Sequence, residues 1–440
     1  MTPRRAEAIA LAEAMLAGHW ARGRIVERLR AAVGRLPFVP RLATQALLAF
    51  PEPPRHARDA LTDLVEGNAG FRLAQAKRLF RVRRWSFAPP RMGPRRWSVP
   101  ALETPGALAA WLGVSTDELD WLADRKGLER FARDERLRHY GYRWIAKRTS
   151  GTRLVEMPKA LLKALQRKVL HEVLAKVPPH EAAHGFHAGR SVATFAAPHA
   201  GRALVLRLDL ADFFPSIGAA RVGAIFRALG YPEPVARLLA GLCTNRAPPP
   251  ALAARPPAEG ERERAARWAS NRVLAAPHLP QGAPTSPALA NLAAHRLDAR
   301  LSAIAARLGA RYTRYADDLA FSFDSEGARH AGRMAALTAA CALDEGLSVR
   351  HSKTRRMRQG VRQRLAGVVV NAHPNVPREA FDRLKATLHN CARAGPASQD
   401  REGRGGLRAR LLGEVAWVAM LNPVRGARLR ELYARIDWGA

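Results

Sequence analysis

The sequence predicts an α+β protein in which a helical N-terminal extension precedes a core that combines helices with an antiparallel sheet. Apolar residues recur at helical spacing in residues 6–33 and again in residues 158–175. Runs rich in β-forming residues, 203–208 and 310–323, lead to carboxylates at a strand end or a turn. With 440 residues, 48% of them hydrophobic, the chain has material for two or three cores.

The chain is strongly basic, since 72 Lys and Arg face 38 Asp and Glu, which gives a formal net charge of +34. Such an excess repels itself in isolation, whereas the phosphates of a nucleic acid neutralise it and release counterions. An arginine bias of a GC-rich genome explains the many arginines but not the scarcity of acids. We therefore expect a nucleic acid as partner, with binding to a membrane surface as the main alternative.

Cysteine use and hydropathy indicate a cytoplasmic protein. Cys243, Cys341 and Cys391 are scattered, odd in number and without CxxC spacing, so neither a zinc site nor a disulfide framework is indicated. Residues 1–9 lack the apolar core of a signal peptide, and no apolar run approaches the roughly 18 residues that span a bilayer. We expect no membrane among the partners.

The predicted extension covers residues 1–105. Helical segments at 6–33 and about 58–80 are followed by a basic, proline-containing linker over 81–105, in which Arg-Arg-Trp occurs at 83–85 and 95–97. Arginines beside tryptophans suit stacking on nucleic-acid bases. A basic strap whose tryptophans pack on the core fits the pattern equally well.

The predicted core spans residues 106–374. It opens with a short helix pair in which Ser115 is the N-cap and Glu118 completes a capping box. Strand-like pieces at 142–145 and 153–156 flank a polar turn that contains Gly151, and the amphipathic helix at 158–175 follows. Residues 246–273 are rich in Pro, Ala and Arg, and we interpret them as a surface insertion between core elements.

The first motif with chemical content is LDLADFFPSI at 208–217, where an apolar strand delivers Asp209 into a turn. A carboxylate in this position is suited to bind a metal ion. Capping of the helix that follows is the alternative role, and this motif alone does not decide between the two.

The second motif is YTRYADDLAFSF at 312–323, which places adjacent carboxylates, Asp317 and Asp318, between β-forming residues. Neighbouring side chains on a strand face opposite ways, so both acids reach one site only from a tight hairpin turn. Their mutual repulsion then favours a divalent cation, whereas a solvent-exposed Asp-Asp turn is the simpler alternative. With Asp209, they supply the acids that two Mg²⁺ ions, about 3.5–4 Å apart, need for nucleotidyl transfer. Asp209 and Asp317 are the expected bridging ligands, and Asp318 an outer ligand or electrostatic support.

These motifs resemble the reverse transcriptase family, and within it the bacterial retron-type enzymes. YADD at 315–318 matches the family's YxDD box, residues 209–217 match the box with its first catalytic Asp, and LPQGAPTSP at 279–287 matches a third box between them. The resemblance extends over about 106–438. It implies an RNA-directed DNA polymerase with a right-hand fold, with fingers and palm over 106–374 and a helical, RNA-binding thumb over 375–440.

The resemblance also implies a set of site residues. Asp209, Leu210, Asp317 and Asp318 would hold two Mg²⁺ ions, for which Mn²⁺ can substitute. Lys353 matches the lysine proposed in the family as general acid for the pyrophosphate. The implied nucleotide-binding residues are Lys147, Arg153, Phe214, Gln281, Gly282, Tyr315 and Ala316. Lys147 and Arg153 would hold the triphosphate, and Phe214 would exclude a 2′-hydroxyl from the sugar site. Ordinary surface charge is the alternative for the three cations.

Retron-type features recur at 184–192 and 412–418. They imply RNA-binding roles for Arg190, His199, Gly367 and Asn371. Two hallmarks depart from the family pattern, because Asn-Ala-x-x-His reads FAAPH at 195–199 and Val-Thr-Gly reads LAG at 365–367.

The retron resemblance implies a companion structured non-coding RNA as template, deoxynucleoside triphosphates as substrates and a branched RNA–DNA product. Antiphage defence through an associated effector protein would be the cellular role. A group II intron-type, diversity-generating or unclassified defence polymerase is the alternative within the family. A catalytically silent, basic RNA-binding scaffold is the alternative from another class of protein.

Overall fold

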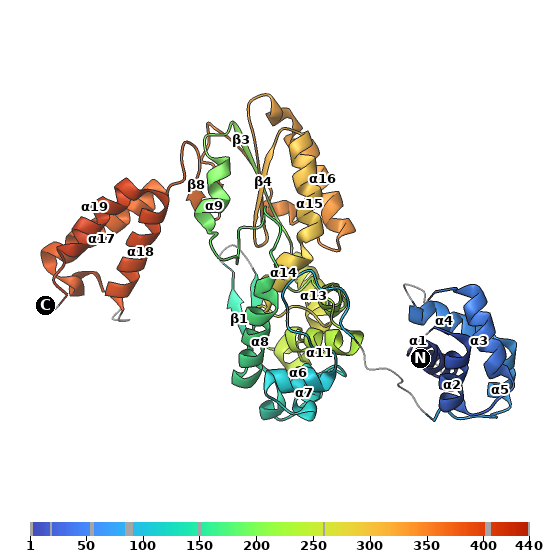
Figure 1. The fold of residues 1–440 in the computed structure, drawn as a ribbon. Helices are drawn as coiled ribbons and strands as arrows, with labels where there is room; N and C mark the ends of the chain where they lie inside the picture. Colours follow the sequence, from blue (N-terminus) through green and yellow to red (C-terminus); the bar gives the residue numbers. More distant parts are fainter. Residues whose placement is uncertain are drawn as a thin grey trace. The chain divides into compact units, whose positions relative to one another are not determined.

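The computed structural model describes residues 3–17, 20–52, 57–83, 91–147, 151–257, 260–400 and 406–438. The chain divides into two compact units, Met1–Met92 and Gly93–Ala440. Figure 1 shows the helical N-terminal unit in blue and the larger unit in cyan to red. Helices and antiparallel sheets coexist in the larger unit, which confirms the predicted α+β class.

The N-terminal unit consists of helices packed around an apolar core. Its helices are α1 (Pro3–Leu16), α2 (Arg22–Val33), α3 (Phe38–Ala49), α4 (Ala57–Gly67) and α5 (Ala69–Ala76). On α2, Ile25, Leu29 and Val33 recur at helical spacing and are buried. Each of the two predicted helical segments is therefore divided in two, and the sequence patterns did not predict α3 between them.

The linker that we predicted over 81–105 is described only in part, because residues 84–90, with most of the first Arg-Arg-Trp, lie outside the described residues. In the second Arg-Arg-Trp, the Arg96 guanidinium lies 5.5 Å from the centroid of the Trp97 ring. The Gly93 N–H donates to the Gly230 carbonyl (2.7 Å), so the end of the linker packs within the larger unit.

A two-stranded hairpin and several helices form the first part of the larger unit. The hairpin pairs β1 (Tyr140–Ala146) with β2 (Thr152–Pro158) in antiparallel register. The helices are α6 (Pro105–Leu112), α7 (Thr116–Ala123), α8 (Ala160–Glu172), α10 (Ala219–Ala228) and α11 (Glu233–Cys243). The predicted capping box at Ser115 and Glu118 begins α7 and is confirmed.

The segment that we interpreted as an irregular insertion is largely helical. It contains α12 (Pro249–Ala253) and α13 (Glu261–Ala275). The indole N–H of Trp144 on β1 donates to the Ala251 carbonyl (2.8 Å), and Leu154, Ala247 and Leu274 form a small buried cluster. The segment is therefore a helical cover of the β1–β2 hairpin rather than a free loop.

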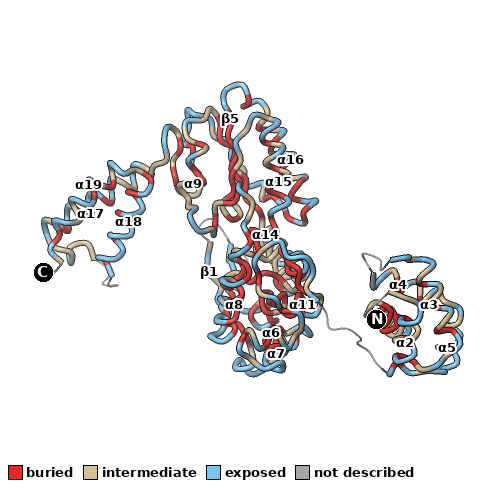
Figure 2. Tube along the Cα trace, in the orientation of Figure 1, coloured by how far each residue is buried: buried red, intermediate tan, exposed pale blue. Residues whose placement is uncertain are grey.

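The central sheet has four antiparallel strands in the order β4-β5-β3-β6. Its strands are β3 (Leu204–Asp209), β4 (Arg311–Tyr315), β5 (Asp318–Phe323) and β6 (Arg355–Arg358). The inner strands β3 and β5 are almost wholly buried, as the red trace at β5 in Figure 2 shows. Three helices lie before and after β4 and β5 in the sequence: α14 (Ser286–Ala293), α15 (His295–Arg307) and α16 (Ala331–Asp344). Of these, α15 packs against both β4 and α16.

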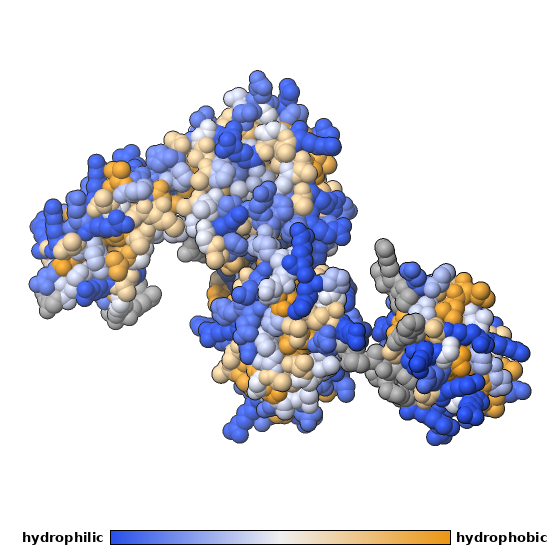
Figure 3. Space-filling view, in the orientation of Figure 1, coloured by the Kyte–Doolittle hydropathy of each residue, from blue (hydrophilic) through white to orange (hydrophobic). Residues whose placement is uncertain are grey.

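The C-terminal part of the chain is a group of three helices, drawn in orange to red in Figure 1. They are α17 (Arg378–Ala394), α18 (Leu407–Leu421) and α19 (Pro423–Ala434), preceded by the short strands β7 (Arg364–Leu365) and β8 (Val368–Val369). Leu384, Leu388, Leu411 and Val415 bury their side chains between the helices. The same core cluster continues to Phe195 on α9 (Val192–Ala196). Hydrophilic residues spread over the visible face in Figure 3, as the composition requires.

Candidate active site

Two inner strands of the central sheet bring the predicted acids together. Asp209 ends β3 and stands opposite Asp318, the first residue of β5, in the antiparallel register. Asp317 lies in the turn between β4 and β5, and its carbonyl accepts a hydrogen bond from the Leu210 N–H (2.9 Å). The strand end and the hairpin turn therefore converge at one edge of the sheet.

A buried ion pair holds this turn in place. The Arg314 guanidinium on β4 donates to both carboxylate oxygens of Asp298 on α15 (2.8 and 2.6 Å), and both side chains are fully buried. Arg314 also donates to Asn291 Oδ1 (3.0 Å) and to the Ala316 carbonyl (3.1 Å). Ala316 has a φ of 55°, a left-handed conformation that an alanine adopts only when its surroundings impose it. The ion pair thus positions the turn that carries Asp317.

The acids border a cavity of about 640 Å³. Asp209, Leu210 and Asp317 line it on the side of the sheet. Basic residues make up much of the remaining lining: Lys147, Arg153, Arg207, Arg350, Lys353 and Arg355. Carboxylates, which are suited to metal ions, and cations, which are suited to phosphates, therefore line one cavity.

Asp209 is surrounded by cations from the segment after α16. Its Oδ2 lies 2.8 Å from the Lys353 ammonium, and its Oδ1 lies 3.8 Å from Arg350 Nε. Oδ1 is buried and has no hydrogen-bond partner in the structure. A buried carboxylate oxygen without a partner is unfavourable until a ligand completes its surroundings.

Asp318 is held differently from the other two acids. Its Oδ1 accepts hydrogen bonds from Arg207 Nε (2.8 Å) and Nη2 (2.6 Å), and it is not among the residues that line the cavity. Arg207 precedes Asp209 by two positions on β3, so both side chains lie on the same face of the strand. The charge of Asp318 is thereby balanced inside the protein.

Burial and neighbouring charges shift the pKa values of three titratable residues at this site. Burial raises the pKa of Asp317 to about 6, and repulsion from Asp318 and Asp209 adds to this effect. Burial also raises the pKa of Asp318, although Arg207 opposes the rise. Burial lowers the pKa of Lys147, while Asp212 acts in the opposite direction. The site therefore disfavours the ionised form of Asp317 until a further cation arrives.

The residues of the cavity fit a divalent cation of the magnesium type. Asp209 and Asp317 offer carboxylate oxygens, which are the hard ligands that Mg²⁺ prefers, and one of these oxygens has no other partner. Within the part of the chain that the structure describes, no group of three or more His, Cys, Asp or Glu side chains is arranged to hold a metal ion by itself. Mg²⁺ is commonly bound by one or two carboxylates together with substrate phosphates, so an open site of this kind is what the chemistry requires.

Four residues of the predicted nucleotide site line the cavity: Lys147, Arg153, Phe214 and Gln281. Phe214 is partly exposed there, whereas its neighbour Phe213 is buried and packs near the Arg314 guanidinium. Lys147 is the residue that directly follows β1, and its ammonium lies 3.9 Å from Asp212 Oδ1. The β1–β2 hairpin thus faces the carboxylates across the cavity.

Gly282 follows Gln281 in the chain but is not among the residues that line the cavity. The Glu156 N–H donates to the Gln281 carbonyl (2.9 Å), so the loop follows β2 closely. A Cβ at Gly282 would lie 2.6 Å from the Glu156 carbonyl oxygen, and the residue has a φ of 136°. Only glycine fits a position with both constraints.

Tyr315 and Ala316 do not line the cavity but support its edge. The Tyr315 ring packs against Phe195 and Phe186, with centroids 5.7 and 6.4 Å away. Ala316 is buried. Gly185 packs closely against the backbone of this turn, because a Cβ at Gly185 would lie 2.8 Å from the Ala316 nitrogen.

The predicted RNA-binding residues are in different surroundings. His199 is fully buried, and its ring nitrogens bond Ser322 Oγ (2.7 Å) and Thr313 Oγ1 (2.8 Å). Both ring nitrogens are thus engaged within the central sheet, and the RNA-binding role of His199 stays a prediction. The Asn371 side chain accepts a hydrogen bond from the Gln363 N–H and donates to the carbonyls of Gln359 and Val361.

The other two residues of that set remain near the surface. Arg190 donates to the carbonyls of Glu181 and Ala183, with part of its side chain accessible. Gly367 lies between β7 and β8 with a φ of 93° and open space around its Cα. Both positions are free to contact an external partner.

Sequence reasoning missed three charged residues of the site. Arg207 and Arg350 contact the acids, and Asp212 joins Lys147 and Arg350. The only sequence signal was proximity to the motifs, because Asp212 and Arg207 lie within a few residues of Asp209 and Arg350 lies three residues before Lys353. In a chain with 72 basic residues, that signal is weak.

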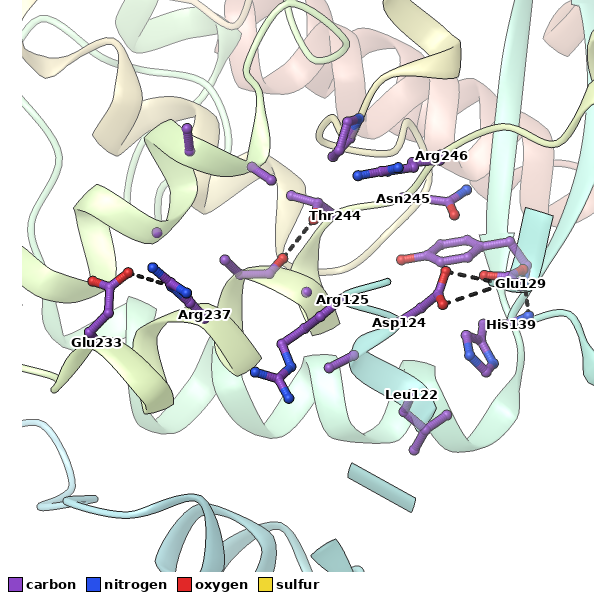
Figure 4. Close-up of a pocket in the computed structure, with 18 of the residues that line it drawn as sticks. Leu122, Asp124, Arg125, Glu129, His139, Glu233, Arg237, Thr244, Asn245 and Arg246 are labelled. Atoms are coloured by element: carbon purple, nitrogen blue, oxygen red, sulfur yellow. Dashed lines mark hydrogen bonds and ion pairs between the residues drawn. The ribbon is translucent and has the colours of Figure 1, made fainter. Parts of the chain in front are cut away.

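A second cavity, of about 460 Å³, lies away from the acids among the helices that precede and follow the hairpin. Figure 4 shows Glu233 bonded to Arg237 and the carboxylates of Asp124 and Glu129 beside His139. Among its charged groups, Arg227 and Arg237 both pair with Glu233 (3.1 and 2.5 Å), and Asp124 and Glu129 accept hydrogen bonds from backbone N–H groups. We assign no chemistry to it.

Known proteins resemble the chain over the region that contains the acids. The family model described as reverse transcriptase (RNA-dependent DNA polymerase) matches residues 145–375. The retron Mx65 reverse transcriptase of Myxococcus xanthus is 44% identical over 334 residues, which cover 76% of this chain and 72% of that protein. The retron Mx162 reverse transcriptase of the same organism is 38% identical over 351 residues, which cover 75% of this chain and 67% of that protein.

More distant similarities are weaker. A telomerase structure from Candida albicans has a TM-score of 0.33 at 10% identity, covering 66% of this chain and 56% of that one, too little to add to the assignment. Among the described residues, every helix is too short or too polar to span a membrane. The family match implies the use of a divalent metal ion. By its sequence and by the arrangement of its acids, the chain belongs to the reverse transcriptase family and, within it, to the retron reverse transcriptases.

Proposed function

We propose that this retron reverse transcriptase adds deoxynucleotides to a primer at the cavity bounded by Asp209 and Asp317, with two Mg²⁺ ions held by these acids. The observation that carries the proposal is a pair of carboxylates, buried Asp209 and half-buried Asp317, beside a cavity lined with cations; Asp209 Oδ1 has no hydrogen-bond partner. Two such ions activate the primer hydroxyl and stabilise the leaving pyrophosphate. We expect Mn²⁺ to substitute for Mg²⁺.

The three acids have unequal roles in this proposal. Asp209 and Asp317 would be the bridging ligands, with Leu210 beside them in the lining of the cavity. Asp318 would be an electrostatic support, because Arg207 already occupies one of its oxygens at 2.6 Å. Asparagine in place of Asp318 should therefore reduce activity less than asparagine in place of Asp209 or Asp317.

Lys353 is the proposed proton donor for the pyrophosphate. Its ammonium bonds Asp209 Oδ2 (2.8 Å), and its side chain remains partly exposed to the cavity. Asp209 would hold the metal ion in place of this bond, and the Lys353 ammonium would then be available to the leaving phosphate. The proton would pass from Nζ to a pyrophosphate oxygen as the bond to the transferred phosphoryl group breaks.

The remaining cavity residues would hold the incoming deoxynucleoside triphosphate. Lys147 and Arg153 would bind its phosphates, since both are cations on the hairpin opposite the acids. Phe214 would lie against the sugar at C2′, where a 2′-hydroxyl collides with the ring. Gln281 and the backbone at Gly282 would border the nucleotide and template.

Residues 106–374 would form the fingers and palm, and residues 375–440 the thumb. The proposed template is a companion structured non-coding RNA, and the product a branched RNA–DNA molecule, because the relatives that share most of this chain are retron reverse transcriptases. The net charge of +34 supports a large polyanionic partner. Antiphage defence with an associated effector protein is the cellular role that we propose.

Primer extension on an RNA template with deoxynucleotides and Mg²⁺ tests the site. Wild-type protein should incorporate nucleotides, and Asp209→Asn and Asp317→Asn should reduce incorporation by at least about 10³-fold without loss of fold. Asp120→Asn, which removes an exposed acid paired with Arg125, is the matched control and should retain activity. Retained activity in both site variants would contradict the assignment.

Sequencing the nucleic acid that copurifies with the protein tests the substrate. DNA joined to one RNA species through a branch is the expected result. A wild-type protein that binds RNA but incorporates nothing would favour the silent scaffold instead.

A further inference from the structure

We propose that Arg350 is a triphosphate-binding residue of this enzyme. The inference rests on the proposed function, since it adds a residue to the same nucleotide site. No sequence motif assigns a role to Arg350, which lies three positions before Lys353. Its side chain lines the cavity and is 28% exposed.

The backbone of Arg350 is fixed to the strand end that carries the acid. The Arg350 N–H donates to the Asp209 carbonyl (2.7 Å), and the Ala211 N–H donates to the Ser348 carbonyl (2.8 Å). Between these bonds, Leu210 and Val349 form an isolated antiparallel bridge. The Arg350 side chain therefore starts from a defined point next to Asp209, whatever its guanidinium contacts.

The guanidinium itself is held loosely. Its Nε lies 3.8 Å from Asp209 Oδ1 and its Nη2 lies 3.4 Å from Asp212 Oδ1, both longer than a good charge-assisted hydrogen bond. Arg207 provides the contrast, because its Nη2 lies 2.6 Å from Asp318 Oδ1. Arg207 therefore forms a short ion pair with Asp318. Arg350 makes only long contacts with Asp209 and Asp212, and its guanidinium can leave them for an acceptor that it binds more strongly.

Charge balance indicates which acceptor that is. Asp209 and Asp212 share three cations, because Lys353 contacts Asp209 (2.8 Å) and Lys147 contacts Asp212 (3.9 Å) in addition to Arg350. A divalent ion on Asp209 would neutralise this carboxylate and repel the guanidinium. The phosphates that accompany the ion offer a planar guanidinium two acceptor oxygens at once, a geometry that arginine fits better than lysine.

The proposed exchange couples the two ligands of the site. When the metal ion takes Asp209, Arg350 loses an acceptor and gains one only if the triphosphate is present. Metal and nucleotide should therefore bind with positive cooperativity that depends on Arg350. Its backbone bonds need not change, because rotation of the side chain is sufficient.

Steady-state primer extension with Arg350→Ala and Arg350→Lys tests the inference. We expect Arg350→Ala to raise KM for the deoxynucleotide by about 10- to 100-fold, the range of a lost hydrogen bond to a charged group. Inhibition by pyrophosphate should weaken by a similar factor, while affinity for the template–primer stays unchanged. Arg350→Lys should be intermediate, because it keeps the charge without the forked geometry. Arg333→Ala, on the exposed face of α16, is the control for loss of one positive charge.

The outcomes separate this inference from the proposed function. An unchanged KM and unchanged pyrophosphate inhibition would overturn the role of Arg350 while leaving the polymerase intact. A lower kcat with unaltered pyrophosphate inhibition would also overturn it, since that pattern belongs to a residue that only positions Asp209. If Arg350→Ala does not fold, the same two constants measured for Arg350→Lys decide the question. A wild-type enzyme without activity would instead count against the proposed function.

Discussion

Replacement of Asp317 by asparagine should make the metal-free protein more stable while it abolishes polymerisation. The reason is the cost of an ionised carboxylate in this cavity. Burial and the neighbouring Asp318 and Asp209 raise the pKa of Asp317 to about 6 from an ordinary value of 3.8. Asparagine resembles the protonated acid in shape and carries no charge to bury.

The size of the effect follows from linkage between ionisation and folding. Between pH 3.8 and about 6 the unfolded chain has lost the proton of Asp317 while the folded protein retains it, so wild-type stability falls as the pH rises. Above about pH 6 Asp317 is ionised in both states, and its ionisation no longer changes the stability. A pKa difference of about 2 pH units corresponds to about 3 kcal/mol. This value already includes the attraction of Asp317 for Lys353, which opposes the rise in pKa.

Chemical denaturation in EDTA, at a series of pH values, measures the difference. The Asp317→Asn variant should exceed wild type by up to about 3 kcal/mol at pH 8 and by nothing near pH 4. Added Mg²⁺ should stabilise wild type and close the gap, because the ion supplies the missing charge. Asp318→Asn is the informative comparison, since it leaves Arg207 without its partner and should gain less.

Two results would refute the reasoning. If Asp317→Asn is no more stable than wild type at pH 8 without metal, the carboxylate is not under electrostatic strain. If the variant is more stable but the gain is the same at pH 4, the cause is packing and not ionisation. In either case the raised pKa of Asp317 would no longer support a cation site in this cavity.

Three further substitutions test other contacts. Arg314→Ala should lower the free energy of unfolding by about 3–5 kcal/mol, because it leaves the fully buried Asp298 unpaired; an unchanged denaturation midpoint would contradict this. Gly282→Ala should lower kcat/KM by displacing the loop from Glu156, while Gly413→Ala, with open space around it, should not; equal activity of the two would argue against the close approach. Phe214→Ala should admit ribonucleotides in a primer-extension assay, and unaltered sugar selectivity would remove Phe214 from the sugar site.

The central sheet could be predicted from the sequence because its strands are short apolar runs that end at acids. The run at 203–208 became β3 (Leu204–Asp209), and the pattern at 310–323 became β4, a turn and β5. α3 and the helices of the 246–273 segment were not predicted. In that segment, the prolines at 248–250 and 256–257 favoured a loop, although the Ala- and Arg-rich stretches have good helix propensity.

The acids of the site were predictable because their motifs are local, and the cations around them were not. Arg350 meets Asp212 only after the chain has passed through two more strands and several helices, so no window of sequence contains the pair. The surroundings of His199 could not be predicted for a related reason. Its box departs from the family pattern at Phe195, and the burial of its ring beside Ser322 and Thr313 is a property of the assembled sheet.

Glu156 joins pieces of chain that are far apart. Its buried carboxylate accepts hydrogen bonds from Asn245 Nδ2 (2.8 Å) and the Gln281 N–H (3.3 Å) and pairs with the His278 ring (2.9 Å). Asn245 and His278 also exchange backbone hydrogen bonds with each other (2.9 and 3.0 Å). The chain thus leaves the core and returns to it at a single point. Because both ends of this excursion and the Gln281 N–H meet the same carboxylate, loss of that group would disturb the excursion and the loop that carries Gln281 together.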